Sequence, residues 1–122
     1  MAKVFLDANY FIDAIHRKPE KEILPSLLNH VIYTSTLSWH IYCYAFKIKV
    51  PDKRVTLQKE EFQITEFTEK ILTNALVGPT SDFEDNVQLH SAAEAECDIF
   101  LTSDKAILNM KFFGKVRIAN NI

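Results

Sequence analysis

A short apolar strand that runs into an aspartate constrains this 122-residue chain more than any other feature. Val4, Phe5 and Leu6 favour β-structure and show no helical or alternating period, which is typical of a strand buried on both faces. Asp7 follows at once and therefore lies at the carboxyl end of the predicted strand. In an open parallel sheet, ligands bind at that edge. The start of the chain therefore predicts a parallel sheet with a carboxylate at its ligand-binding edge.

The same arrangement recurs far downstream. The apolar run 99–101 leads through Thr102 and Ser103 to Asp104. Two buried strands that both end in an aspartate bring two carboxylates to one edge of one sheet. A simpler interpretation is that each aspartate only caps the helix that follows it. We favour a shared site because a third acidic group is predicted to point to the same place.

That third group is Asp85, in a helix predicted over residues 81–96. Ser81 and Glu84 form a capping box, with the serine as the cap. Asp85 shares one helical face with apolar residues that follow it: Leu89, Ala92 and Ala93. An inward carboxylate is costly unless it is paired or bound to a cation. Asp82 lies near the same face. The alternative is that Asp82, Glu84 and Asp85 only place negative charge at the helix N-terminus, where it is favourable. That alternative explains Asp85 poorly, because the face that carries it is apolar.

Strand and helix patterns alternate along the chain. Further strands are predicted over 31–35, 62–64 and 116–118, and helices over 8–16, 20–29, 37–48, 68–76 and 105–109, with 52–61 helical toward its end. This order indicates an α/β fold, a three-layer α/β/α sandwich around a mainly parallel central sheet. No linker or repeat divides it, so residues 1–122 are expected to form a single domain.

Composition narrows the functional classes. The net charge of −2 gives no overall basic field for nucleic acid, although a local basic groove stays compatible with it. One basic run is either a solvated face or a contact for an RNA backbone: Lys47, Lys49, Lys53 and Arg54. Cys43 and Cys97 lack metal-ligand spacing and are expected to be reduced thiols. With no signal peptide or membrane-spanning run, we expect a cytoplasmic protein without a membrane partner.

Convergence of Asp7, Asp85 and Asp104 would create an all-oxygen, strongly negative pocket. Hard divalent cations such as Mg²⁺ or Mn²⁺ prefer such ligands. A metal bound there can generate hydroxide for in-line attack on a phosphodiester. No glycine-rich phosphate loop, paired-cysteine metal motif or serine nucleophile elbow competes with this interpretation.

Three neighbours are candidate supporting residues. Asn9 would orient Asp7 through its amide, and Thr102 and Ser103 would hold water or a phosphate oxygen. The alternative is that these three are ordinary turn residues.

Three motifs in this order resemble a known family: Leu6-Asp7-Ala8-Asn9, Asp82-Phe83-Glu84-Asp85 and Leu101-Thr102-Ser103-Asp104. Together they resemble PIN domains, most closely the small VapC-type ribonucleases that form the toxin half of toxin–antitoxin pairs. The resemblance implies a Mg²⁺- or Mn²⁺-dependent endoribonuclease that cleaves RNA, forms a homodimer and is held inactive by an antitoxin protein. It also implies that Asp7, Asp85 and Asp104 bind the metal and are catalytic.

The chain departs from this family at one position. The family usually places a glutamate early in the helix after the second strand, where we place His40 in this sequence. His40 is either a metal ligand through its neutral imidazole or a histidine at the edge of the core face. No acidic residue occurs between Glu22 and Asp52. A second hypothesis is therefore a catalytically impaired PIN-fold module that binds RNA or a protein partner. A third, a phosphoacceptor of the response-regulator type, requires an aspartate after a central strand, but Thr65 and Glu66 follow the third strand.

Overall fold

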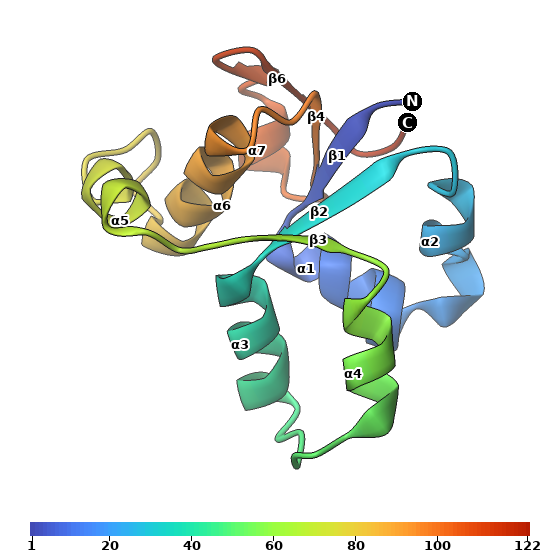
Figure 1. Ribbon diagram of the computed structural model, residues 1–122. Helices are drawn as coiled ribbons and strands as arrows, with labels where there is room; N and C mark the ends of the chain where they lie inside the picture. Colours follow the sequence, from blue (N-terminus) through green and yellow to red (C-terminus); the bar gives the residue numbers. More distant parts are fainter.

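The computed structural model describes residues 1–122 and contains one six-stranded sheet with strand order β3-β2-β1-β4-β6-β5. The strands are β1 (Lys3–Leu6), β2 (Val31–Ser35), β3 (Gln63–Thr65), β4 (Ile99–Leu101), β5 (Phe112–Phe113) and β6 (Val116–Ala119). Every neighbouring pair is parallel except β5 and β6. This confirms the predicted α/β class with a mainly parallel sheet, and β1 lies at its centre (Figure 1).

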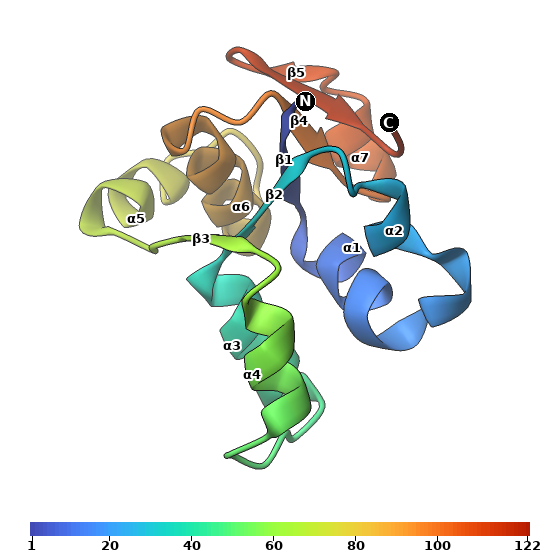
Figure 2. The same ribbon diagram turned by 45° about the vertical axis from the view of Figure 1, so that its right-hand side comes forward.

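The helices cover both faces of this sheet. They are α1 (Ala8–Ile12), a π-helical turn η1 (Asp13–Arg17), a 3₁₀ turn η2 (Pro19–Lys21), α2 (Ile23–Ser26), α3 (Thr36–Ala45), α4 (Lys53–Lys59), α5 (Glu69–Ala75), α6 (Phe83–Glu94) and α7 (Lys105–Leu108). Helices α1 and α2 lie on one side and α5 and α6 on the other (Figure 1). Helices α3 and α4 project together beyond the sheet, as Figure 2 shows most clearly.

Alternation along the central strands builds two cores. Val4 and Leu6 of β1 pack into an apolar cluster with Phe11 of α1. Phe5, between them, points to the opposite face and stacks on Phe100 of β4, with ring centroids 5.6 Å apart. The central strands are thus buried on both faces, as their unbroken apolar runs predict.

Two predicted helices differ in the structure, and one strand was not predicted. The helix expected over 20–29 is broken at Glu22, whose φ of 48° is left-handed and cannot continue a right-handed helix. The helix expected over 37–48 ends at Ala45, well before Pro51. The short strand β5 was not predicted and forms a hairpin with β6 in which Gly114 takes a φ of 61°.

The two cysteines are free, as expected: Cys97 is buried and Cys43 is half-buried. None of the helices has the length and apolar character needed to cross a membrane.

Candidate active site

Asp7 is a buried carboxylate at the carboxyl end of β1, with 6% of its surface exposed. Its backbone N–H extends the sheet ladder by donating to the carbonyl of Leu101, at 3.0 Å. Its side chain caps α1, where Oδ1 accepts a hydrogen bond from the Ala8 N–H at 2.8 Å. The other oxygen, Oδ2, accepts from the Thr102 hydroxyl at 2.8 Å. Both oxygens are therefore fixed, one by the first residue of α1 and the other by the residue that follows β4.

Thr102 connects the two strand ends. Its buried hydroxyl donates to Asp7 and accepts from the Asp104 N–H at 3.1 Å. Its own N–H donates to the Ala119 carbonyl at 3.0 Å, which ties the loop to β6. Because this hydroxyl already serves Asp7 and Asp104, it positions the site. Its single proton is given to Asp7, so it cannot also donate to a phosphate oxygen, which is one of the contacts that the sequence suggested.

The electrostatics place Asp85 in the same cluster. Its pKa is raised from 3.8 to about 7, first by burial and then by the charges of Asp82, Asp7, Asp104 and Glu84, in that order. Burial likewise raises the pKa of Asp7 to about 6, although its hydrogen bonds from Thr102 and Ala8 oppose the shift. Each carboxylate is thus held in the field of several others.

Glu84 belongs to this cluster although the sequence interpretation gave it only a role at the helix terminus. Its charge raises the pKa values of Asp7 and Asp85, and its own pKa is raised by burial and then by Asp82. The signal that could have found it is its place in the same acidic motif, one residue before Asp85.

The capping interpretation holds for the same aspartates. Asp104 caps α7, because its Oδ1 accepts from the backbone N–H groups of Ala106 at 2.8 Å and Ile107 at 3.1 Å. Asp82, not Ser81, caps α6 and accepts from the Asp85 N–H at 3.0 Å. Thr80 shifts the cap by one residue, since its hydroxyl accepts the Asp82 N–H at 3.0 Å. A cap uses one carboxylate oxygen and leaves the other for a ligand.

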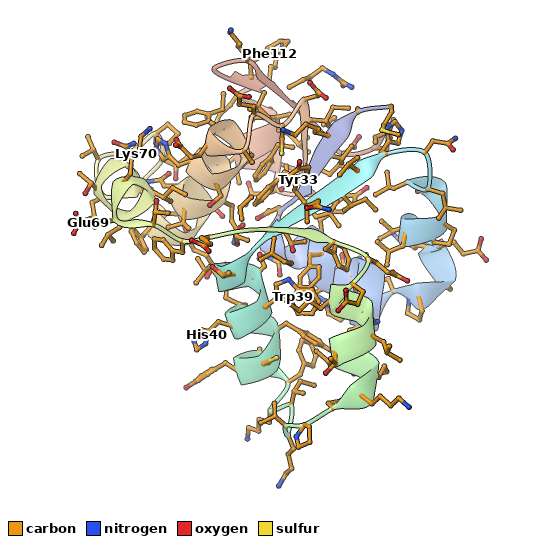
Figure 3. All side chains as sticks on the ribbon, viewed as in Figure 1. Tyr33, Trp39, His40, Glu69, Lys70 and Phe112 are labelled. Carbon is orange, nitrogen blue, oxygen red and sulfur yellow. The ribbon has the colours of Figure 1, made fainter.

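Two supporting candidates lie elsewhere. The amide oxygen of Asn9 accepts from Arg17 at 3.2 Å and makes no hydrogen bond with Asp7, so the orienting role belongs to Thr102. His40 lies on the exposed face of α3 and points away from the sheet, as Figure 3 shows. Its ring centroid lies 6.0 Å from that of Tyr44.

The start of α3 meets α6 through neutral groups instead. Ser35 and Ser38 are both buried, and their hydroxyls bond to the Gln88 amide at 3.0 Å and 3.1 Å. Gln88 lies one helical turn after Asp85. The polar residues that α3 presents to this region are therefore uncharged.

The donor set suits a hard divalent cation. It consists of carboxylate oxygens, and the Asp85 carboxylate and Asp104 Oδ2 accept no hydrogen bond from the protein. Clustered like charges repel, and a bound cation relieves that repulsion. In the side-chain positions described, no three acidic, histidine or cysteine side chains already surround an ion position. Metal binding would thus require side-chain rotation, and Asp85 and Asp104 have the free oxygens for it.

Comparison with known proteins agrees with this architecture. A family model described as PIN domain matches residues 3–106. No curated protein sequence matches the chain. Among solved structures, the fold is similar to a chain in the crystal structure of VapBC2 from Rickettsia felis bound to a DNA fragment from their promoter. That match has a TM-score of 0.67 and 12% identity, and covers 96% of this chain and 97% of the other. From the family match over residues 3–106, we conclude that this chain belongs to the PIN domain family.

Proposed function

We propose that this protein is a metal-dependent endoribonuclease that hydrolyses RNA phosphodiester bonds. The observation that supports it is the cluster of Asp7, Asp85 and Asp104 at the carboxyl edge of the central strands, in which burial first and the neighbouring charges second raise the pKa values of Asp7 and Asp85. An all-carboxylate cluster at this edge is suited to holding a hard cation against a phosphate.

The proposed roles follow from the contacts of each residue. Asp7, Asp85 and Asp104 would hold Mg²⁺ or Mn²⁺, which when bound supplies an activated water and a positive charge for the phosphate. Asp7 is the fixed member, because Thr102 and the Ala8 N–H hold both of its oxygens. Asp104 and Asp85 keep free oxygens. Asp82 and Glu84 add negative charge that strengthens cation binding.

We further infer that the protein acts as the toxin of a toxin–antitoxin pair and forms a homodimer. The similar solved structure is of VapBC2 with promoter DNA, and its matched chain is covered almost completely by this one. An antitoxin protein is thus the proposed partner, and RNA the proposed substrate.

RNA cleavage by the purified protein, with Mn²⁺, with Mg²⁺ and with a chelator, tests the function. Cleavage should require a divalent ion and fall at least ~100-fold in Asp7→Asn and Asp85→Asn, since each removes a metal ligand. Glu60→Gln, a charge change at the exposed residue that follows α4, is the matched control and should cleave like the wild type. Equal cleavage by all three variants would locate the activity elsewhere.

One observation favours the second candidate, a PIN-fold module impaired in catalysis. Residues 36–45 of α3 contain no acid, and Ser35 and Ser38 engage Gln88 instead. Specific RNA or protein binding by a folded sample that leaves RNA intact in Mn²⁺ would favour this candidate.

A further inference from the structure

A polar cavity of about 280 Å³ opens beside the carboxylate cluster, on the side of the sheet edge that carries α1. Its lining includes Tyr10, Asp13, Lys18, Lys21, Ser26 and Ser103. Ser103 stands between Thr102 and Asp104 in the chain, and consecutive Cα atoms are ~3.8 Å apart. The cavity therefore begins within one residue of a proposed metal ligand.

The charges around this cavity favour an anion. Asp13 forms its closest ion pair with Arg17, at 2.8 Å, and a looser one with Lys18, at 3.6 Å. Lys21 forms no ion pair in the structure. Because Arg17 balances Asp13, the two exposed lysines leave the cavity with positive charge.

Hydrogen-bond donors complete the cavity. The Ser103 hydroxyl makes no hydrogen bond within the protein, and Ser103 lines the same cavity as the two lysines. The hydroxyls of Ser26 and Tyr10 are already used, donating to the carbonyls of Ile23 at 2.6 Å and Asn120 at 3.0 Å. Two ammonium groups and one free hydroxyl are suited to phosphate oxygens.

The local backbone places the lysines there. The π-helical turn η1 ends at Arg17, and η2 and the left-handed Glu22 then turn the chain back toward α2. Figure 2 shows this segment curling beside α1 and α2. An uninterrupted helix would have carried Lys21 away from the strand ends.

We propose that this cavity is a phosphate subsite that holds an RNA backbone phosphate adjacent to the one being cleaved. This inference rests on the proposed nuclease function. The acidic cluster repels an approaching RNA strand, and a net charge of −2 supplies no general attraction. The ammonium groups of Lys18 and Lys21 would hold one phosphate of the strand while the metal binds the neighbouring phosphate.

The rival surface is the basic run in the connection from α3 to α4 and in the first turn of α4, which project away from the sheet (Figure 1). Arg54 there already donates to the Tyr42 hydroxyl at 3.0 Å and to Gln58 at 3.3 Å. Lys49 and Lys53 are exposed and serve as matched controls, because replacing both changes the charge by the same amount as replacing Lys18 and Lys21.

The experiment measures binding of a short single-stranded RNA by fluorescence anisotropy in chelator, where no cleavage occurs, across a series of salt concentrations. Lys18→Gln/Lys21→Gln should bind about tenfold more weakly at ~50 mM salt, and its slope of log affinity against log salt should fall by about 0.7 per lost phosphate contact. Lys49→Gln/Lys53→Gln should retain both affinity and slope. Ser103→Ala should weaken binding without changing the slope, since it removes no charge.

Several outcomes would overturn the subsite. They are an unchanged affinity and slope in Lys18→Gln/Lys21→Gln, or a larger loss in Lys49→Gln/Lys53→Gln. Titration of inorganic phosphate, followed by amide NMR, separates the sources: shifts at Lys21 and Ser103 without lysine-dependent RNA binding would indicate a free-phosphate site and overturn the proposal. If the protein binds RNA through Lys18 and Lys21 and yet fails to cleave it with Mn²⁺, the phosphate subsite stands and only the proposed nuclease function is wrong.

Discussion

Asp7 carries a buried carboxyl group that links folding stability to pH. Its pKa is about 6 in the folded protein against 3.8 ordinarily, so the folded state binds the proton more tightly than the unfolded state. This stabilisation is complete below about pH 3.8 and is lost as pH rises through about 6. We expect this one group to remove on the order of 3 kcal/mol of unfolding free energy from the metal-free protein across that window.

Asp7→Asn tests this link. Asparagine still caps a helix, but it does not titrate, so the variant should show a flatter pH dependence and match or exceed wild-type stability near neutral pH. Urea unfolding in chelator at several pH values measures it, with Glu60→Gln as the control that keeps the wild-type slope. Asp7 would be only a helix cap if Asp7→Asn is less stable than the wild type near neutral pH, keeps the wild-type dependence of stability on pH and binds Mn²⁺ with unchanged affinity.

The Thr102 hydroxyl is the group that keeps Asp7 ionisable. Its donation lowers the pKa of Asp7, so Thr102→Val should raise that pKa above about 6. The same change leaves the Asp104 N–H without its acceptor, and the two losses should cost about 1–2 kcal/mol. Carboxyl NMR titration and urea unfolding measure the two effects. Thr73→Val, at an exposed position on α5, should change neither.

His40 separates the sequence-based expectation from the structure. If His40 stood in place of the family's glutamate, His40→Glu would strengthen Mg²⁺ binding. Because the structure places it on the exposed face of α3, we expect His40→Glu to leave Mg²⁺ affinity within about twofold of wild type. Isothermal titration of Mg²⁺ and Mn²⁺ into both proteins measures it. A clear gain in affinity would return His40 to the metal site.

At the scale of the element, α6 delivers Asp85 through its first turn. Asp82 caps this helix, and its charge is the largest charged contribution to the raised pKa of Asp85. Asp82→Asn should therefore keep the cap but lower the pKa of Asp85 below about 7, as carboxyl NMR would show. Ser81→Ala should alter neither, because the cap lies one residue later than the capping box predicts. If Ser81→Ala changes the pKa of Asp85 and Asp82→Asn does not, then Ser81 caps the helix, as the capping box predicts.

Elements with strong periodic or apolar patterns could be predicted from sequence, whereas those decided by tertiary contacts could not. The run Val4 to Leu6 is a buried strand because only a strand buries consecutive apolar residues on two faces. The helix break at Glu22, where the backbone is left-handed, has no signal in the local hydrophobic pattern. It depends on the path that residues 18–22 take beside the sheet. The two-residue strand β5 exists only because β6 pairs with it.

The same division applies to the candidate site. Strand ends gave Asp7 and Asp104, and helical periodicity gave Asp85. The orienting partner of Asp7 was misassigned because Asn9 is near in sequence, whereas Thr102 approaches from 95 residues away. Contacts of that separation follow from strand order, which the sequence pattern does not specify.

At the scale of the whole molecule, metal binding and folding should be coupled. A cation that binds only the folded protein stabilises it by mass action, about 2.7 kcal/mol at a hundredfold excess over Kd. Protons compete for Asp7 and Asp85, whose pKa values lie near 6 and 7, so Mn²⁺ should raise Tm more at pH 8 than at pH 5. Thermal scans at both pH values, with Asp85→Asn as the variant expected to lose the gain, measure it. Equal shifts at both would exclude these carboxylates as ligands.

The central position of β1 also governs when the site is completed during synthesis. β1 pairs with both β2 and β4, yet β4 and the Thr102 hydroxyl are made about 95 residues after Asp7. Until residues 99–102 leave the ribosome, Asp7 has no strand beside it to receive its N–H and no hydroxyl to fix its carboxylate. Contacts so distant in sequence form late. A chain interrupted before β4 therefore carries Asp7 without the partners that complete its site, so the proposed nuclease activity would be absent while the protein is being made.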